Sequence, residues 1–347
     1  MTDISIRKTG HAGHITLNRH KALNALTWDM CLAIEQALDD WRDDPDVALI
    51  LIDGAGDRAF CSGGDIAEMY AAGQRGDLDY GRRFWRDEYR LNAKLYNYTK
   101  PIVTFLHGFT MGGGVGVGCH ASHRIVCETS QIAMPECSIG LVPDVGGSLI
   151  LAKASGHCGE FLGVSGDRMD AADAIYVGFA DHYVPQDAWD ELKATLIKTG
   201  DLKAIESTER AAPAARLADW QDEIDACFGG ANLGDIYRAM PDTPGPAMTH
   251  ARKLMDRNAP LAMAVAVKTI QAARHDPHIE NALDREFRYT YRCVAQGDFI
   301  EGIRAAIIDR DRNPKWQHSS WDAVTAEDVA AMTRDLGKDA LQWKDKA

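Results

Sequence analysis

Two carboxylates in one glycine-rich stretch have the types and spacing best suited to chemistry in this chain. Glu136 stands in Met-Pro-Glu-Cys, and Asp144 follows eight residues later in Val-Pro-Asp-Val-Gly-Gly. Apolar and turn-forming neighbours partly remove a carboxylate from water, which raises its pKa. Such a group can attack a carbonyl carbon or take a proton from water. The structural alternatives are a helix-starting Glu136 near a helix dipole and a simple N-cap role for Asp144.

Two glycine-containing turns precede these carboxylates. Residues 60–65 read Phe-Cys-Ser-Gly-Gly-Asp, and residues 112–114 are three consecutive glycines that follow an apolar, strand-like run at 101–106. Glycine lets backbone N–H groups approach a ligand closely, and N–H groups at a helix start can hold a developing oxyanion. The alternative is that these glycines only permit tight turns. Together with the carboxylates, the turns indicate chemistry at an activated carbonyl.

The stretch from 100 to 147 resembles the crotonase, or enoyl-CoA hydratase/isomerase, superfamily. Within that family, PECSIGLVPDVGG resembles the 3-hydroxyisobutyryl-CoA hydrolase branch, whose reaction belongs to valine catabolism. The resemblance covers nearly the whole chain to about Trp316. Four other segments support it in order and spacing: ITLNRHKALNAL at 15–26, AFCSGGDI at 59–66, DEYRLN at 87–92 and DFIEGIRAAIIDRDRNPKW at 298–316.

The resemblance implies a role for each candidate residue. The backbone N–H groups of Gly64 and Gly113 would form an oxyanion hole for the thioester oxygen. Glu136 would act as nucleophile or general base, Asp144 would orient the attacking water or the acyl hydroxyl, and Glu88 would line the substrate site. A solvated helix face is the alternative for Glu88. Coenzyme A would be part of the substrate, and we expect no separate cofactor and no metal. Its contacts would come from Lys21, Ala22, Leu23, Asp65 and Ile66.

One position separates the hydrolase interpretation from its rivals. Family hydratases carry a second catalytic glutamate two residues after the glycine triplet, where this chain has Gly116. Addition of water to a double bond requires an acid and a base, so Gly116 favours hydrolysis. An enoyl-CoA hydratase or isomerase with rearranged acid and base groups remains an alternative. So does a non-catalytic acyl-CoA-binding homologue, although a mere binder has no need of two partly buried carboxylates.

Composition narrows the class of partner. The net charge of −13 argues against nucleic acid, and it means that an anionic CoA ester must be bound by a local basic patch. Arg19, Lys21 and Lys315 are candidates for that patch. No apolar run is long enough to cross a membrane, the N-terminus has no secretory signal, and the eight scattered cysteines indicate a reduced, cytoplasmic setting. Because family members often form trimers, the resemblance leaves a homo-oligomer open.

The pattern of elements predicts how the candidate residues are positioned. Apolar runs, glycine-rich turns and amphipathic stretches alternate from residue 1 to about 200, which predicts an α/β core. The resemblance makes this core a crotonase-like spiral of ββα turns carrying the acyl-CoA site. From 201 to 347 the strand signals fade, and we expect a helical C-terminal region. Its last 30 residues are charged, and we expect a loosely held helix there.

Overall fold

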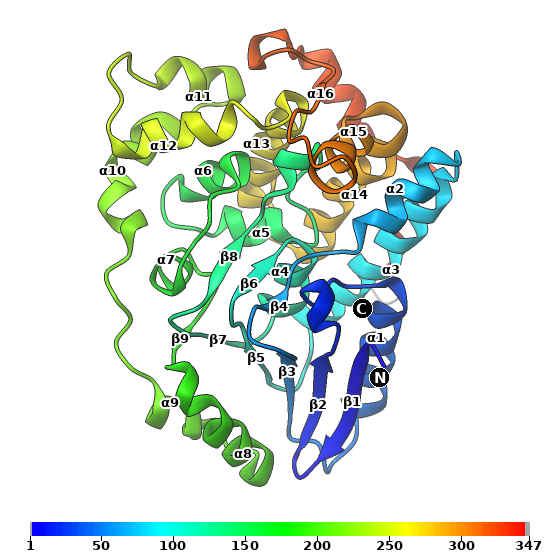
Figure 1. Ribbon diagram of the computed structural model, residues 1–347, viewed down its shortest axis with the longest axis vertical. Helices are drawn as coiled ribbons and strands as arrows, with labels where there is room; N and C mark the ends of the chain where they lie inside the picture. Colours follow the sequence, from blue (N-terminus) through cyan, green and yellow to red (C-terminus); the bar gives the residue numbers. More distant parts are fainter. Residues whose placement is uncertain (1, 344–347) are drawn as a thin grey trace. The chain divides into compact units, whose positions relative to one another are not determined.

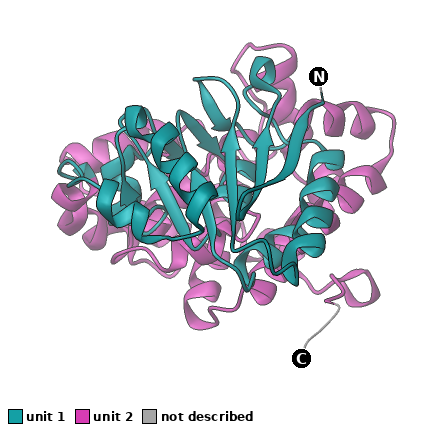
Figure 2. Cartoon of the chain, turned by 90° about the horizontal axis from the view of Figure 1, so that it is seen from below, with its two compact units in different colours: residues 1–64, 91–133, 168–216 teal, residues 65–90, 134–167, 217–347 magenta. Residues whose placement is uncertain are grey.

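The computed structural model describes residues 2–343 (Figure 1). They form two compact units. Each unit is assembled from three stretches that are separated in the sequence (Figure 2). The domain boundary that we expect near residue 200 stays a prediction. Among the described residues, every strand lies in unit 1. Unit 1 contains residues 1–64, 91–133 and 168–216, and unit 2 contains residues 65–90, 134–167 and 217–347.

Unit 1 is built on two sheets, which confirms the predicted α/β class. The larger sheet has the order β1-β2-β3-β5-β7-β9, and the smaller has the order β4-β6-β8. Among the described strands, only β1 and β2 pair antiparallel, in an N-terminal hairpin; the other neighbours in the sheets are parallel. The strands are β1 (Ile4–Thr9), β2 (Ala12–Leu17), β3 (Leu49–Gly54), β4 (Ala59–Cys61), β5 (Ile102–Phe105), β6 (Phe109–Met111), β7 (His123–Val126), β8 (Gln131–Ala133) and β9 (His182–Tyr183).

Helices cover the middle of the larger sheet, where β3 and β5 are buried on both faces. Side chains alternate along a strand, so Leu49 and Leu51 of β3 share one face. That face packs with Trp189 and Leu192 of α8 in a buried cluster. An added Cβ at Gly13 of β2 would lie within 2.3 Å of the Trp41 ring, so α1 packs closely there. The helices lying wholly in unit 1 are α1 (Trp28–Arg42), α4 (Gly113–Gly118), α7 (Ala171–Tyr176), α8 (Trp189–Thr199) and α9 (Lys203–Thr208).

Unit 2 is helical, and the described part of residues 201–347 contains no strand. The apolar helix α13 packs against both α5 and α6, and the amphipathic α14 packs against α13 and α5. Two helices, α3 (Leu78–Tyr96) and α10 (Arg216–Phe228), have residues in both units. The others are α2 (Ile66–Gln74), α5 (Gly147–Ala152), α6 (Cys158–Ser165), α11 (Leu233–Ala239), α12 (Pro246–Met255), α13 (Pro260–His275), α14 (Ile279–Gln296), α15 (Phe299–Ile303) and α16 (Ala326–Thr333).

The C-terminal helix is held more firmly than its charged sequence suggests. The helix α16 begins with a capping box between Thr325 and Asp328. Its Met332 is buried, and the helix packs against α13 and α14. The expectation of a loosely held helix is therefore wrong for this segment, because one apolar side chain and two helix contacts fix it. The predicted loosely held helix also included residues 344–347, which lie outside the described residues.

All eight cysteines are buried and none forms a disulfide. Burial raises the pKa of the Cys119 thiol to about 12, and it raises the pKa of Cys137 and Cys293 well above the ordinary value. The thiols therefore behave as small apolar side chains within the folded protein.

Candidate active site

The Asp144 carboxyl lies buried in the turn that precedes α5. Its Oδ2 accepts a 2.7 Å hydrogen bond from the Tyr89 hydroxyl, and its backbone oxygen accepts one of 2.6 Å from Gly147 N. The N-cap position of α5 is Gly146, so the alternative in which Asp144 caps this helix is wrong. Burial raises the pKa of Asp144 to about 7, against the lowering effect of the Tyr89 hydrogen bond. The carboxyl is thus placed to change protonation near neutral pH.

The Glu136 carboxyl is buried in the same unit. Glu136 is the first residue of the short 3₁₀ helix η2 (Glu136–Ile139), and its backbone oxygen accepts a hydrogen bond from Leu141 N. Among the described residues, its Oε2 has no hydrogen-bond partner. Burial raises the pKa of Glu136 well above the ordinary value, and the charge of Asp144 raises it further. An unpaired, buried carboxyl oxygen suits a group that acts on a bound molecule.

Glu88 is also buried, with only 2% of its surface exposed. It lies on α3 immediately before Tyr89, in the part of that helix that belongs to unit 2. The solvated helix face, our alternative for Glu88, is therefore wrong. Burial raises the pKa of Glu88 strongly, and the charge of Asp144 adds to this effect. Three carboxyls singled out in the sequence thus lie within one electrostatic cluster of unit 2.

A fourth carboxyl, Glu286 of α14, completes the cluster. Its Oε2 accepts a hydrogen bond of 2.8 Å from Gly146 N, and its Oε1 accepts one of 3.0 Å from Ser148 N and a short one from the Ser148 hydroxyl. Burial raises the pKa of Glu286 to about 8, while the bonds from Ser148 and Gly146 oppose the rise. Glu286 is fully buried and holds the turn next to Asp144.

The cluster is suited to proton transfer near neutral pH. Burial disfavours the ionised form of every member, and nearby carboxylates repel one another, so protons are retained at pH values where free carboxyls have lost them. A base with a pKa near the working pH is an effective catalyst. The four carboxyls are those of Glu88, Glu136, Asp144 and Glu286.

The two glycine turns meet within unit 1. An added Cβ at Gly63 would lie 3.9 Å from Gly113 N, and one at Gly114 would lie 2.3 Å from Cys61 O, so the turns pass close together. Within the described part of the chain, neither Gly64 N–H nor Gly113 N–H has a hydrogen-bond acceptor. These are the donors that the sequence resemblance assigns to an oxyanion.

The segment expected to meet coenzyme A lies beside one of these turns. Leu26 N donates to Gly63 O, and Ser62 N donates to Leu23 O. Lys21 is exposed, as a phosphate-binding side chain requires. Arg19 donates a hydrogen bond of 2.6 Å to Ala25 O, and its role in phosphate binding stays a prediction. Of the remaining predicted substrate-binding positions, Ala22 lies in the same short helix as Lys21, whereas Asp65 and Ile66 stand at the start of α2 in unit 2.

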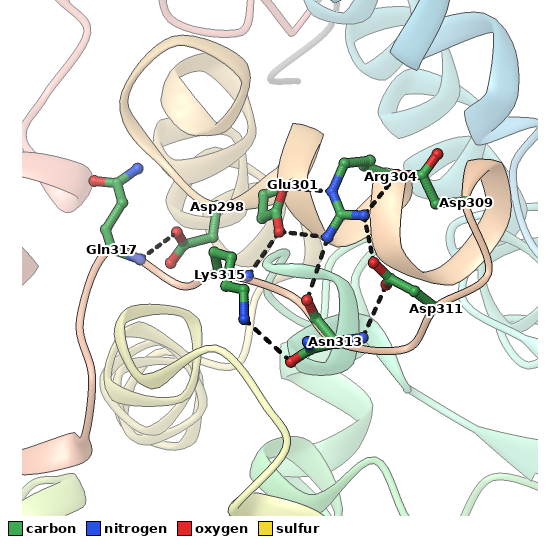
Figure 3. Close-up of polar contacts among 8 residues, drawn as sticks. All are labelled: Asp298, Glu301, Arg304, Asp309, Asp311, Asn313, Lys315 and Gln317. Atoms are coloured by element: carbon green, nitrogen blue, oxygen red, sulfur yellow. Dashed lines mark hydrogen bonds and ion pairs between the residues drawn. The ribbon is translucent and has the colours of Figure 1, made fainter.

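Lys315, the third basic candidate, lies in a tightly bonded exposed segment of unit 2 (Figure 3). Arg304 organises this segment. Its guanidinium binds both carboxyl oxygens of Glu301 at 2.8 Å and also contacts Asp309 at 2.6 Å and Asp311 at 2.7 Å. Lys315 N donates to Glu301 Oε1, and its Nζ lies 3.4 Å from Asn313 Oδ1. The backbone of Lys315 is therefore fixed while its ammonium remains at the surface.

Tyr89 and Glu286 were missed as site residues from the sequence. Tyr89 adjoins Glu88 in DEYRLN, and a tyrosine beside a candidate carboxyl was a usable signal. Glu286 sits among charged residues of an amphipathic helix, where nothing in the pattern marks it as buried. Among residues 2–343, no group of histidines, cysteines and carboxylates could hold a metal ion, and no helix is long and apolar enough to cross a membrane.

Comparison with known proteins places these features in a family. The family model described as enoyl-CoA hydratase/isomerase matches residues 12–333. The human protein named 3-hydroxyisobutyryl-CoA hydrolase, mitochondrial, is 33% identical over 352 residues, which cover 98% of this chain and 91% of the human one. The zebrafish (Danio rerio) protein of the same name is also 33% identical, with 94% and 88% covered.

Solved structures confirm the predicted crotonase-like fold. A structure titled as an enoyl-CoA hydratase from Rhodobacter sphaeroides 2.4.1 superposes with a TM-score of 0.95 at 50% identity, covering 99% of this chain and all of that one. A structure titled as a carnitinyl-CoA dehydratase from Mycobacterium thermoresistibile gives a TM-score of 0.92 at 38% identity, covering 96% and 97%. Two of these four relatives are named as hydrolases, one as a hydratase and one as a dehydratase.

Proposed function

The chain belongs to the enoyl-CoA hydratase/isomerase family, and we propose that it hydrolyses the thioester of a short, branched 3-hydroxyacyl-CoA. The products are the free acid and coenzyme A. The observation that carries this proposal is the buried pair of Glu136 and Asp144, with the Asp144 carboxyl held by the Tyr89 hydroxyl. The curated human and zebrafish relatives, named for 3-hydroxyisobutyryl-CoA, support that ester as the first substrate to test.

The proposed chemistry assigns one task to each residue. The N–H groups of Gly64 and Gly113 hold the thioester oxygen as it gains negative charge. Glu136 either attacks the carbonyl carbon or removes a proton from the water that does. In the general-base route, Glu136 takes a proton from the attacking water as the C–O bond forms, and this proton goes to the CoA sulfur as the C–S bond breaks. In the nucleophilic route, the new C–O bond joins the acyl group to Glu136 as the C–S bond breaks, and water then hydrolyses this anhydride and supplies the proton of the CoA thiol. Asp144 orients the water or the acyl hydroxyl, and Glu88 recognises the polar end of the acyl group.

Hydration of an enoyl-CoA is the second candidate, because the solved structure at 50% identity carries that title. The sequence of α4 counts against it. That helix reads Gly-Gly-Val-Gly-Val-Gly, and Gly116, the place of the family's second glutamate, has no side chain to move a proton. A hydratase would have to recruit Glu88 or Asp144 as its second acid or base.

Two substrates separate these candidates in one assay. The purified protein is mixed with 3-hydroxyisobutyryl-CoA and, separately, with crotonyl-CoA, while free thiol and enoyl absorbance are followed. Thiol release from the first, with little change in the second, supports the hydrolase. Loss of enoyl absorbance without thiol would replace it with a hydratase, and CoA-ester binding without either signal would indicate a non-catalytic homologue.

The Glu136→Gln variant tests the mechanism. Because the amide can neither attack the carbonyl nor accept a proton, we expect kcat to fall by about 100- to 10,000-fold. Glu160→Gln is a matched control, since Glu160 is an equally buried glutamate of unit 2 that pairs with Arg274. Its kcat should remain close to that of the wild type. Near-normal hydrolysis by Glu136→Gln would rule out the assigned role.

A further inference from the structure

The turn that carries Asp144 has an unusual backbone. Val145 has φ of 53° and Gly146 has φ of 78°, so two consecutive residues are left-handed. Glycine adopts this conformation freely, but a β-branched valine does so rarely, because its side chain crowds the backbone. Val145 is also buried, at 1% exposed. Such a conformation persists only where surrounding contacts determine it.

Glu286 supplies those contacts. One carboxyl oxygen accepts Gly146 N–H, and the other accepts Ser148 N–H together with the Ser148 hydroxyl. Both atoms are removed from water, since Glu286 is fully buried. The carboxyl therefore binds two backbone N–H groups of the turn, immediately after the left-handed valine. Water does not compete with it for these donors.

The same helix also holds the surroundings of Asp144. Tyr289 OH donates to Gly140 O at 3.0 Å, four residues before Asp144. The Thr290 hydroxyl lies 3.4 Å from Tyr89 OH, and the Phe287 ring packs edge-on against Tyr89 at 6.1 Å. One face of α14 thus fixes the start and the end of the Asp144 segment and also the phenol that binds the Asp144 carboxyl.

We propose that Glu286 is a positioning residue, which holds the left-handed turn at Val145 and Gly146 so that the Asp144 carboxyl meets the Tyr89 hydroxyl. The role for turnover rests on the proposed function, because it takes Asp144 to act in hydrolysis. Glu286 itself touches no substrate in this proposal. Its loss should therefore change the rate of the bound complex more than the binding of substrate.

The first test is Glu286→Gln, which keeps the shape of the side chain. An amide presents an oxygen to only one side of the turn, and its NH₂ group meets N–H donors on the other. We expect kcat to fall roughly 100-fold with KM changed by less than about 3-fold, as for a displaced catalytic group. Glu160→Gln again serves as the matched control for the loss of a buried carboxylate in unit 2.

Two further variants keep the proposal testable if Glu286→Gln does not fold. Glu286→Asp retains the carboxyl group but draws it back by one methylene, and it should lower kcat at unchanged KM. Ser148→Ala removes only the hydroxyl donor while Ser148 N–H remains, and it should have a smaller effect than Glu286→Asp. A kcat for Glu286→Asp within about 3-fold of the wild type, or no lower than that of Ser148→Ala, would overturn the proposal.

A crystal structure of Glu286→Asp separates this proposal from the proposed function. We expect the Asp144 Oδ2 to Tyr89 OH distance to exceed hydrogen-bonding range, beyond 3.5 Å. If the wild type releases no thiol from any acyl-CoA, the proposed function fails, yet a broken Asp144–Tyr89 bond in the variant still supports the positioning role. Retention of the bond would overturn the positioning role, whether or not the wild type is a hydrolase.

Discussion

At the scale of single residues, the protonation of Asp144 is the property most open to experiment. Burial raises its pKa to about 7, and the Tyr89 hydroxyl lowers it by donating to the ionised form. If ionised Asp144 orients the attacking water, kcat falls as pH drops below about 7. The hydrogen bond from Tyr89 is therefore a means of keeping the carboxylate ionised at neutral pH.

The Tyr89→Phe variant tests this relation. Loss of a donor to a carboxylate raises its pKa, so we expect the acidic limb of the kcat profile to move upward by about 1 pH unit. At high pH the variant should recover most of the wild-type kcat. Tyr98→Phe is the control, because Tyr98 OH donates to the backbone oxygen of Leu38 in unit 1. An unshifted limb in Tyr89→Phe would show that Asp144 does not control the profile.

The sequence singled out two of the buried carboxyls as candidates but did not show how they are held. Glu136 and Asp144 were found because their apolar, glycine-rich surroundings are local in the sequence. Glu286 was missed because its burial depends on a turn 140 residues away. The left-handed Val145 was equally invisible, since valine is among the residues least expected in that conformation.

At the scale of elements, local signals account for the long helices. Thr27 caps α1 by accepting from Met30 N, and α13 and α14 lie in the region after residue 200 where we expect helices. The sequence pattern does not delimit the short helices α5, α6 and α7. They contain glycine or only one or two turns, and their stability comes from packing rather than from propensity.

The segment around Arg304 offers a prediction at this scale. One guanidinium joins Glu301 of α15 to Asp309 and Asp311 (Figure 3), so Arg304→Met should release the segment from 309 to 315. We expect faster amide hydrogen exchange there. Arg310→Met is the matched control, because Arg310 lies in the same segment and, among the described residues, its side chain donates only one hydrogen bond, of 3.2 Å to Ile307 O. Equal exchange in both variants would mean that the Arg304 contacts do not hold the segment.

At the scale of the whole molecule, the two compact units divide the candidate residues. Unit 1 carries the glycine turns and the Lys21 segment, and unit 2 carries the buried carboxyls. Each unit is drawn from three stretches of chain, so no single cut separates them. The sequence showed a change from strands to helices near residue 200, but which distant stretches share a unit depends on long-range packing that no local pattern records.

Buried carboxyls with raised pKa values affect the stability of the entire fold. Asp144 has a pKa of about 7 when folded and near 4 when unfolded, so the folded state binds more protons between these values. Its contribution to stability is present below about pH 4 and is lost as pH rises through 7. Relative to Asp144→Asn, the wild type should lose on the order of 4 kcal/mol across this window, as measured by urea unfolding.

Asp53 provides a comparison in which the dependence of stability on pH has the opposite sign. Hydrogen bonding and charge from His14, with Lys193, lower the pKa of Asp53 to about 2 despite its burial. Asp53 is therefore ionised in both states above about pH 5, and its contribution is lost only as pH falls toward 2. Relative to Asp53→Asn, wild-type stability should fall as pH drops from about 4 to 2. A flat difference between the wild type and Asp144→Asn from pH 4 to 7 would show that Asp144 titrates normally in the folded protein.

The eight buried cysteines have a practical consequence for measurement. Only a thiolate reacts rapidly with a chromogenic disulfide reagent, and these side chains are buried and form no disulfide. The folded enzyme should thus be silent toward the reagent that detects coenzyme A, and released thiol can be followed in real time. Because the folded protein does not react, the reagent also reports unfolding. In the absence of substrate, the rate of slow colour formation measures how often the protein opens and exposes its buried cysteines.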